Sequence, residues 1–255
     1  MRNITIFTMP RCFKSHFAVI QQNAIKSWLL LDPTPEIILC GNDEGVAEAA
    51  EELGVIHISD IKLSNEGTPM TDSTFNEVRS IAKNDILACV NSDILLLDDF
   101  LGTIDKVVSV LLHRFMIVGQ RWDLDVTEHI DFSNPSWKNI LHEEVVKHGK
   151  LHPTCGIDYF IFEKEISINM LPFPIGRTCW DNWFMSQALR IGVNVVDATE
   201  KIFAIHQEHR QFHIEEYTNN RIGKESAMCR KLAQGSMAHI DSANWKFSNG
   251  KLVKK

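Results

Sequence analysis

The chain has 255 residues, of which 44% are hydrophobic and 23% are charged, and its formal net charge is −7. This composition is typical of one large globular domain, or of one domain with an appendage, and it argues against a nucleic-acid groove over the whole surface. The longest apolar runs fall short of the roughly 20 residues that span a bilayer, and the N-terminus has no signal-peptide pattern. We therefore expect a soluble, cytoplasmic protein.

The first half of the chain alternates strand and helix patterns, as in a doubly wound sheet. Strands are predicted at residues 3–8, 36–40, 55–58, 85–91 and 115–119. Between the first two strands, apolar residues recur at three- and four-residue steps and predict a helix; shorter helices are predicted at 46–53 and 74–83. These patterns predict an α/β fold.

The regular alternation breaks after Asp123. Residues 124–136 predict an irregular loop, and such loops are often functional. Beyond it the sequence predicts a helix at 136–148, a buried strand at 156–162, a helix from Asp181 to near Gly192, and two short strands between 194 and 205 that lead to His206. We expect a main domain at 1–215 and, at 216–255, a helical C-terminal extension with a solvated basic tail.

Polar residues follow several predicted strands, at the end of the sheet where open α/β folds bind ligands. The most informative group is Asn91-Ser92-Asp93, which interrupts an apolar run. Mg²⁺ and Mn²⁺ prefer hard oxygen ligands and are often completed by substrate phosphates, so Asp93 is the first candidate metal ligand. The same three residue types are also common in ordinary turns. No dinucleotide-binding glycine motif or P-loop is present in the sequence.

The ordered set of segments resembles the GT-A glycosyltransferases, in which a D-x-D-like triplet closes a central strand. It is more closely similar to chlorovirus glycosyltransferases and to uncharacterised plant and algal proteins, through GNDEGVA (41–47), RWDLD (121–125), GIDYF (156–160) and WDNW (180–183). The resemblance covers roughly residues 3 to 210. It implies the GT-A fold, with a Rossmann-like mixed central sheet flanked by helices, a nucleotide-sugar donor that is usually a UDP-sugar, and Mn²⁺ or Mg²⁺ as cofactor.

The resemblance also implies metal ligands. Asp93 is the ligand on which the motif depends most, Ser92 is its variable middle, and Asn91 stands where the motif has its first Asp. A neutral amide in place of an anion should weaken metal binding when no diphosphate is present. His206 resembles the further metal ligand that many GT-A enzymes take from their C-terminal portion. A structural histidine is the alternative, and His209 and His213 compete with His206 for the role.

Other positions are implied to bind the nucleotide sugar. They are Thr8, Pro10, Arg11, Asn42, Asp43, Arg79, Asn91, Ser92, Arg121 and Asp123. Asn and Asp at 42 and 43 are also common turn residues, and an arginine at position 79 equally suits an exposed salt bridge.

Two acids compete for the catalytic role. Asp181 begins a helix between Trp180 and Trp183, whose rings offer an apolar face to a sugar, and it resembles the general base of many inverting GT-A enzymes. A helix N-cap is the alternative role of the same residue. Asp158 and Asp123 are then expected to orient donor or acceptor hydroxyls.

The predicted function is metal-dependent transfer of a hexose or deoxyhexose from a nucleotide-diphosphate sugar, usually a UDP-sugar in this class, to a hydroxyl of a glycan acceptor. One alternative is a nucleotidyltransferase, which is disfavoured because residues 9–14 contain no glycine. The other is a sugar-nucleotide-binding module without turnover, to which Asn91 gives weight. Neither a nucleic-acid partner nor a membrane span is expected. The sugar, the acceptor, the linkage and the stereochemistry stay open.

Overall fold

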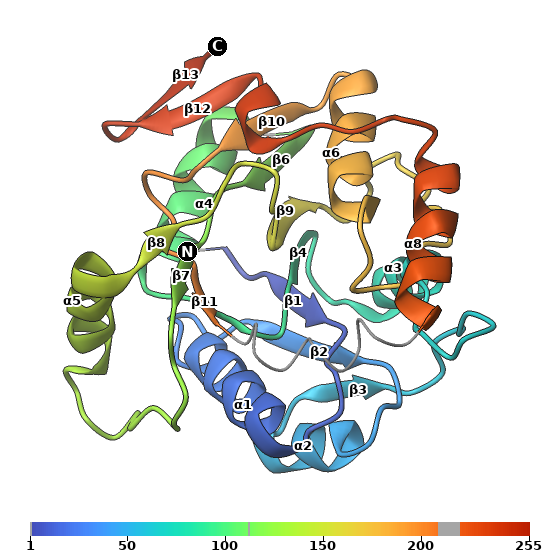
Figure 1. The fold of residues 1–255 in the computed structure, drawn as a ribbon. Helices are drawn as coiled ribbons and strands as arrows, with labels where there is room; N and C mark the ends of the chain where they lie inside the picture. The colour runs from blue at the N-terminus through green and yellow to red at the C-terminus, as the bar shows by residue number, and fades with distance from the viewer. Residues whose placement is uncertain (1, 112, 209–219) are drawn as a thin grey trace.

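The computed structural model describes residues 2–111, 113–208 and 220–255 (Figure 1). Within this part of the chain a mixed nine-stranded sheet runs through the molecule in the order β13-β12-β10-β6-β9-β4-β1-β2-β3. Its strands are β1 (Thr5–Thr8), β2 (Glu36–Cys40), β3 (Ile56–Ile58), β4 (Ile86–Val90), β6 (Phe115–Val118), β9 (Tyr159–Glu163), β10 (Asn194–Asp197), β12 (Trp245–Ser248) and β13 (Lys251–Lys254). The first four of these are parallel, whereas β9 runs antiparallel between β4 and β6.

A second, smaller sheet stands beside the first in the order β5-β11-β7-β8. Its strands are short: β5 (Ile94–Leu95), β7 (Trp122–Leu124), β8 (Lys150–Leu151) and β11 (Ile205–Gln207). β11 is parallel to β7 and antiparallel to β5, so that His206 lies opposite Asp123 on one side and Ile94 on the other. This small sheet brings together four segments that are far apart in the sequence.

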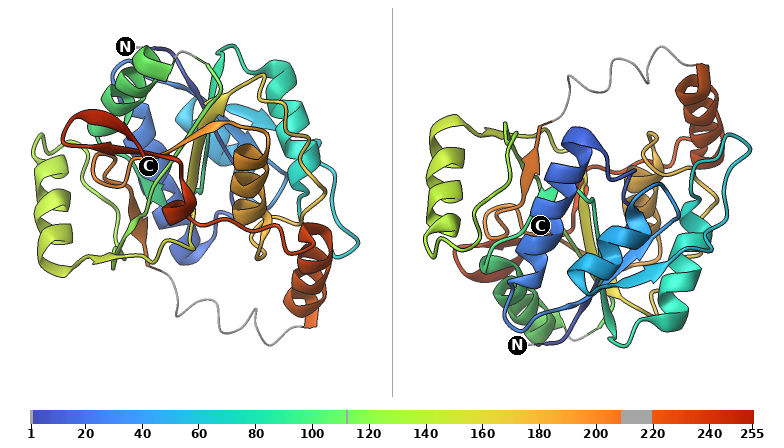
Figure 2. Two further views of the ribbon diagram at one scale, coloured as in Figure 1. Left: turned by 90° about the horizontal axis from the view of Figure 1, so that it is seen from above. Right: turned by 90° about the horizontal axis from the view of Figure 1, so that it is seen from below.

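Helices cover both faces of the large sheet (Figure 2). On one face lie α1 (Ser15–Leu29), α2 (Val46–Leu53) and α4 (Asp99–Leu111), whose apolar residues form one core cluster with the strands. On the other face lie α3 (Thr71–Ile81) and α6 (Trp180–Arg190), with α8 (Asn220–Ala233) packed outside α6. A further helix, α5 (Trp137–His148), covers the small sheet and stands at the side of the molecule in Figure 1.

The central strands are apolar on both faces because both faces are covered. Neighbouring side chains point to opposite sides of a strand, so Ile6 packs into the α1 and α4 core while Phe7 packs into the α3 and α6 core. Phe7 meets Phe75 edge to face with ring centroids 5.2 Å apart, and Phe75 meets Phe184 in the same way at 5.4 Å. Such aromatic pairs contribute about 0.5–1.5 kcal/mol beyond burial of their area.

The predicted elements of the first half are present with shifts of a few residues at their ends. The helix predicted at 74–83 begins earlier, at Thr71, and the irregular segment after β7 packs on α1 through Asn23, which bonds the backbone of Glu128 and Ile130, rather than lining the cavity described below. Among the described residues, no helix has the length and apolar character that a membrane-spanning helix requires.

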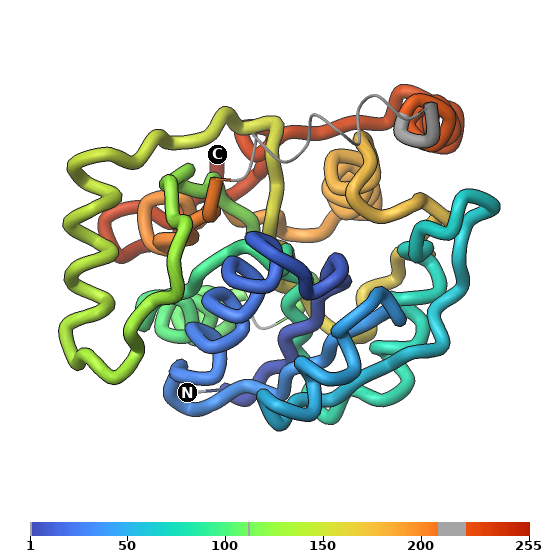
Figure 3. The backbone as a smooth tube through the Cα atoms, turned by 60° about the horizontal axis from the view of Figure 1, so that its bottom comes forward, coloured from blue at the N-terminus to red at the C-terminus, as the bar shows by residue number. Residues whose placement is uncertain are grey.

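The C-terminal prediction is wrong in its last part. Residues 220–233 are helical as expected, but residues 245–254 form a hairpin whose first strand, β12, pairs in parallel with β10 and so extends the central sheet. Phe247 is 2% exposed and belongs to the core, so these residues are not a solvated tail. In the tube view the red C-terminal segment lies beside the orange segment that contains β10 (Figure 3).

Replacing Phe247 with alanine should therefore lower the free energy of unfolding by about 3 kcal/mol, since truncating a buried aromatic removes apolar burial and leaves a cavity. Urea denaturation monitored by circular dichroism measures the loss. Val253→Ala, on the same hairpin but 51% exposed, is the matched control and should change stability by less than about 0.5 kcal/mol. Equal stability of the Phe247 variant and the wild type would mean that the hairpin is not part of the cooperative core.

Candidate functional site

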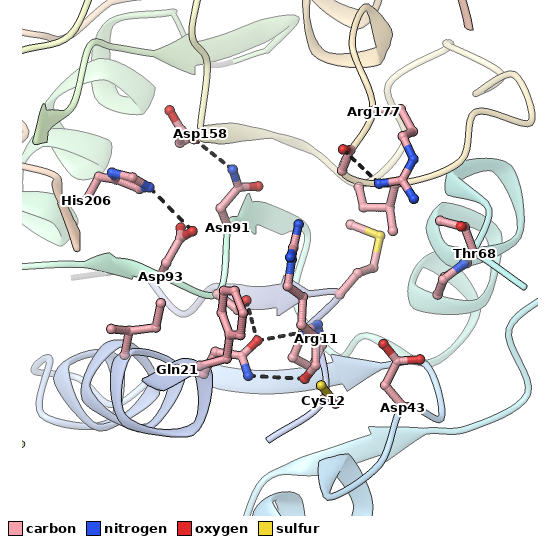
Figure 4. A pocket seen from close by; sticks show the side chains of 18 of the residues that line it. Arg11, Cys12, Gln21, Asp43, Thr68, Asn91, Asp93, Asp158, Arg177 and His206 are labelled. Atoms are coloured by element: carbon pink, nitrogen blue, oxygen red, sulfur yellow. Dashed lines mark hydrogen bonds and ion pairs between the residues drawn. The ribbon is translucent and has the colours of Figure 1, made fainter. Parts of the chain in front are cut away.

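A cavity of about 710 Å³ opens at the carboxyl ends of β1 and β4 and reaches the small sheet (Figure 4). The predicted site residues that line it are Pro10, Arg11, Asp43, Asn91, Ser92, Asp93, Arg121, Asp158 and His206. Parallel strands place their carboxyl ends at one edge of a sheet, which is why loops so far apart in sequence meet here.

Asp93 and His206 face each other in the cavity. Asp93 follows β4 directly and precedes β5, and His206 lies on β11, which pairs with β5. Their closest atoms, Asp93 Oδ2 and His206 Nε2, are 3.5 Å apart. A carboxylate oxygen and an imidazole nitrogen that converge from neighbouring strands are a suitable pair of ligands for Mn²⁺ or Mg²⁺.

Asp123 orients His206 from the other side of the ring. The Nδ1 atom of His206 lies 3.1 Å from Asp123 Oδ1. Burial opposes protonation of His206, but the carboxylates of Asp93 and Asp123 outweigh it and raise its pKa to about 9. A metal-binding histidine usually has a carboxylate beside its other ring nitrogen, and Asp123 occupies that place, within ion-pair distance of His206 Nδ1.

Glu208 is a candidate ligand that the sequence analysis missed. Its Oε1 atom lies 3.6 Å from His206 Nδ1, and it lines the cavity. Ligand atoms of Asp123, His206 and Glu208 lie within 4.8 Å of one another. The signal was present in the sequence, because residues two apart on a strand point to the same face. Glu208 thus lies with Asp123 on the Nδ1 side of the imidazole, whereas Asp93 lies on its Nε2 side.

The structure explains why position 91 carries an amide and not a carboxylate. Its Nδ2 donates to Asp158 Oδ1 at 2.7 Å, and its backbone N–H donates to the Asp158 carbonyl at 2.9 Å. An aspartate at position 91 would place a second carboxylate against Asp158, and like charges this close destabilise each other. The departure from the D-x-D pattern thus matches the partner that this chain has across β4 and β9.

Gln21 is a further residue that the sequence analysis missed. From α1, where it is 1% exposed, it accepts from Ser92 Oγ at 2.9 Å and from the backbone N–H of Arg11 at 2.7 Å, and it donates to the Arg11 carbonyl. The guanidinium of Arg11 lies over the ring of Phe17 at 5.1 Å. Gln21 thus joins the loop after β1 to the triplet after β4, and nothing in its local sequence pattern indicated this.

Four of the residues predicted to bind the nucleotide sugar lie outside the cavity lining. Thr8 is buried at the end of β1, and Asn42 is exposed. Asp123 lies beneath the lining. Arg79 donates to the carbonyls of Ile166 and Ile168 at 3.4 and 3.2 Å. It therefore joins α3 to the turn after β9 and does not line the cavity, which corrects the prediction that it contacts a phosphate.

Asp181 also lies behind the lining residues, in the first turn of α6. Burial raises its pKa to about 7, against backbone hydrogen bonds that include one from Ile157. Trp180 lines the cavity as expected for a sugar-binding ring, whereas Trp183 packs against Phe173 with ring centroids 5.3 Å apart. The predicted aromatic face is therefore provided by one tryptophan.

The rim of the cavity opposite Asp93 and His206 is fixed by Glu225 of α8, which is 3% exposed. Its carboxylate accepts from Ser64 Oγ at 2.6 Å, from Thr68 Oγ1 at 3.0 Å and from Arg177 Nε at 2.7 Å. Burial opposes ionisation, but these hydrogen bonds outweigh it and lower the pKa of Glu225. Because Thr68 and Arg177 line the cavity, α8 supports one of its walls.

Glu225→Ala should lower the free energy of unfolding by about 3 kcal/mol, because it leaves the buried guanidinium of Arg177 without its charge partner. Urea denaturation measures the loss. Glu66→Ala is the matched control: Glu66 forms a surface ion pair with Lys224 at 3.7 Å and is 38% exposed, so its removal should cost less than about 1 kcal/mol. Equal effects of the two substitutions would contradict a supporting role for Glu225.

No protein-family model matches the sequence, and no curated protein matches it. The structure, however, is similar to solved glycosyltransferases. Glucosyl-3-phosphoglycerate synthase from Mycobacterium tuberculosis superposes with a TM-score of 0.53 at 11% identity, over 93% of this chain and 82% of that chain. Its complex with Mn²⁺, uridine diphosphate and phosphoglyceric acid gives a TM-score of 0.51 at 14% identity, over 93% and 80% of the two chains.

The mannosyltransferase PcManGT from Pyrobaculum calidifontis, in complex with GDP-Man and Mn²⁺, gives a TM-score of 0.52 at 12% identity, over 93% of this chain and 66% of that chain. At such identities the likeness concerns the fold. The chain has the GT-A fold of nucleotide-diphospho-sugar transferases.

Proposed function

We propose that this protein is a metal-dependent glycosyltransferase. The observation that carries the proposal is the pair of Asp93 and His206, whose ligand atoms converge in the cavity of a GT-A fold. These two residues would hold Mn²⁺ or Mg²⁺. The metal, when bound, supplies the positive charge that stabilises the leaving diphosphate.

The loops on the other side of the cavity would hold the nucleoside. Pro10 and Arg11 follow β1, Asp43 follows β2, and Thr68 lies on the facing rim, so base and ribose would lie between them. The similar solved structures contain uridine or guanosine nucleotides. On this support we propose a nucleotide-diphospho-hexose donor, a UDP-sugar in the first instance, and a hydroxyl of a glycan as acceptor. The closer similarity to chlorovirus and plant or algal proteins stays an expectation.

Asp158 and Asp181 have different places in this proposal. Asp158 lines the cavity and is held by Asn91 and Arg121, so it would accept hydrogen bonds from sugar hydroxyls as a fixed anion. Asp181 lies behind the lining, so a base role for it requires either that α6 shifts or that the proton passes through another group. The effect of Asp181→Asn on turnover tests its role.

The test is a binding and hydrolysis screen of UDP-glucose, UDP-galactose and GDP-mannose with Mn²⁺, Mg²⁺ or a chelator. A ligand that binds only the folded state raises the melting temperature, so the true donor should stabilise the protein in a metal-dependent way and lose its sugar slowly to water. Metal-dependent binding without hydrolysis would favour the binding module instead. A protein that neither binds nor hydrolyses any nucleotide sugar would refute the proposal.

A further inference from the structure

Asp123 holds two histidines, one on each side. Its Oδ1 atom faces His206 Nδ1 at 3.1 Å, and its Oδ2 atom faces His152 Nδ1 at 2.8 Å. The small sheet makes this arrangement, since β7, which carries Asp123, lies between β11 and β8, and His152 follows β8 directly. The order of the strands thus sets the order of the groups: Asp93, His206, Asp123, His152.

The contact with Asp123 fixes the proton on one nitrogen of His152. Asp123 Oδ1 accepts a hydrogen bond from Arg121 Nε at 2.8 Å and lies 3.1 Å from His206 Nδ1, which leaves Oδ2 to His152. A carboxylate accepts hydrogen bonds, so in the neutral imidazole of His152 the proton lies on Nδ1 and the lone pair on Nε2. His152 lines the cavity, and its Nε2 atom has no hydrogen-bond partner among the described residues.

Two hydrogen bonds hold the backbone of His152 in place, and a glycine makes room for its ring. The backbone N–H of His152 donates to the Arg121 carbonyl at 2.9 Å, and the backbone carbonyl of His152 accepts from Gln120 Nε2 at 2.6 Å. The ring lies against Gly156, where an added Cβ would come within 2.6 Å of Cδ2 and 2.7 Å of Nε2. A glycine at this position therefore makes room for the imidazole, and it gives a physical reason for the Gly156-Ile157-Asp158 motif.

The other acids near the cavity are less suited to taking a proton. Both oxygens of Asp158 are already bonded, one to Asn91 and one to Arg121. Asp181 lies behind the lining, and Glu208 lies beside the metal-binding pair, 3.6 Å from His206. His152 is the group in the cavity that combines a free lone pair with a carboxylate that fixes its tautomer, the arrangement of a general base and its orienting acid.

We infer that His152 is the general base of the reaction and that Asp123 is its positioning residue. This inference rests on the proposed function. In the step, Nε2 of His152 takes the proton of the acceptor hydroxyl, and the electron pair of that oxygen forms the new bond to the anomeric carbon of the donor sugar. The bond from that carbon to the diphosphate oxygen breaks, and its electron pair leaves with the nucleoside diphosphate. The imidazolium then returns its proton to water.

The experiment uses water as the acceptor, so no acceptor has to be known. Hydrolysis of UDP-glucose, or of whichever donor the screen selects, is measured with Mn²⁺ for the wild type, His152→Ala and His152→Asn, and the affinity for UDP with Mn²⁺ is measured by titration calorimetry. Asn places an amide N–H near the position of Nδ1 but has no basic nitrogen. We expect both variants to lose about 1000-fold in kcat, within the usual range for general base catalysis, and to keep KM and UDP affinity within about twofold.

Added imidazole should restore part of the turnover of His152→Ala, which a merely structural role would not allow. Gly156→Ala leaves the imidazole chemically intact but crowds it, and should also lower kcat. His148→Ala, at an exposed histidine on α5 whose side chain is 67% accessible, is the matched control and should match the wild type. Asp181→Asn, measured beside these, should keep far more activity than His152→Ala.

Three outcomes would overturn the inference. Unchanged kcat in both His152 variants would do so while leaving the proposed function standing, provided the wild type hydrolyses a donor. A loss in Asp181→Asn as large as that in His152→Ala, without imidazole rescue of the latter, would assign the base to Asp181. A wild type that neither binds nor hydrolyses any nucleotide sugar would refute the proposed function and this inference together.

Discussion

Replacing Asp93 with alanine should lower the rate of Mn²⁺-dependent donor hydrolysis by at least about 1000-fold. The substitution removes the carboxylate that faces His206 Nε2 at 3.5 Å, and leaves His206 as the remaining member of the proposed ligand pair. A bound metal stabilises the charge of a leaving diphosphate by several kcal/mol, and each 1.4 kcal/mol changes the rate about tenfold. Binding of UDP should lose its dependence on Mn²⁺ in the same variant.

The measurement compares turnover and UDP titration with Mn²⁺ and with a chelator. Asp98→Ala is the matched control, because Asp98 is an acid five residues farther along the chain whose side chain is 67% exposed and pairs with Lys138. It should keep wild-type turnover. Full Mn²⁺-dependent hydrolysis by the Asp93 variant would show that the metal, if any, is held elsewhere.

The place of Asp93 and His206 at the cavity could be predicted because its signal is local. Asp93 interrupts an apolar strand, and His206 ends a short run of apolar residues that leads out of the core. A polar residue at the end of a buried strand is unusual enough to indicate a function by itself. Glu208 follows from the same reasoning one step further, since it shares the strand face of His206.

The network behind this pair could not be predicted, because it depends on which strands are neighbours. β7 and β8 are three and two residues long, too short for a periodic pattern, yet they place Asp123 and His152 side by side. Arg79 shows the opposite error. The position of Arg79 on the helix before β4 predicted a contact with a phosphate. A helical pattern, however, does not show in which direction a long side chain extends.

The C-terminal hairpin carried a signal that the sequence analysis overlooked. Asn249-Gly250 separates two short runs that contain apolar residues, and this dipeptide is a strong indication of a two-residue hairpin turn. Both residues have positive φ, at 50° and 74°. The lysines near the C-terminus indicated an exposed tail, but the buried ring of Phe247 packs the hairpin into the core.

Arg121 should contribute most to stability among the residues of the site. Its Nε donates to Asp123 at 2.8 Å and its Nη1 to Asp158, and the side chains of both acids are 8% exposed. Arg121→Met would leave two buried carboxylates close together without their shared cation. Breaking a buried ion pair by removing one partner usually costs 3–5 kcal/mol, so we expect a loss of about 5 kcal/mol in the free energy of unfolding at pH 7.

The loss should depend on pH with a definite sign. The folded-state pKa of Asp123 is held below its ordinary value of 3.8, so the stability that Asp123 contributes is present above about that pH and is lost as the pH falls toward the folded-state pKa. Arg121→Met already lacks much of this contribution at neutral pH, because Asp123 has lost its guanidinium partner. The difference between wild type and Arg121→Met should therefore be largest near neutral pH and should narrow below about pH 4.

Urea denaturation of both proteins at several pH values, in the presence of a chelator so that metal binding does not enter, measures the difference. Arg2→Met is the matched control, because Arg2 reaches Asp105 only at 3.9 Å with 49% of its side chain exposed, and its loss should be under about 1 kcal/mol at every pH. A loss for Arg121→Met that is the same at pH 7 and pH 3 would mean that its cost comes from packing. In that case the charge of Arg121 would not be what holds Asp123 and, through it, both histidines of the cavity in place.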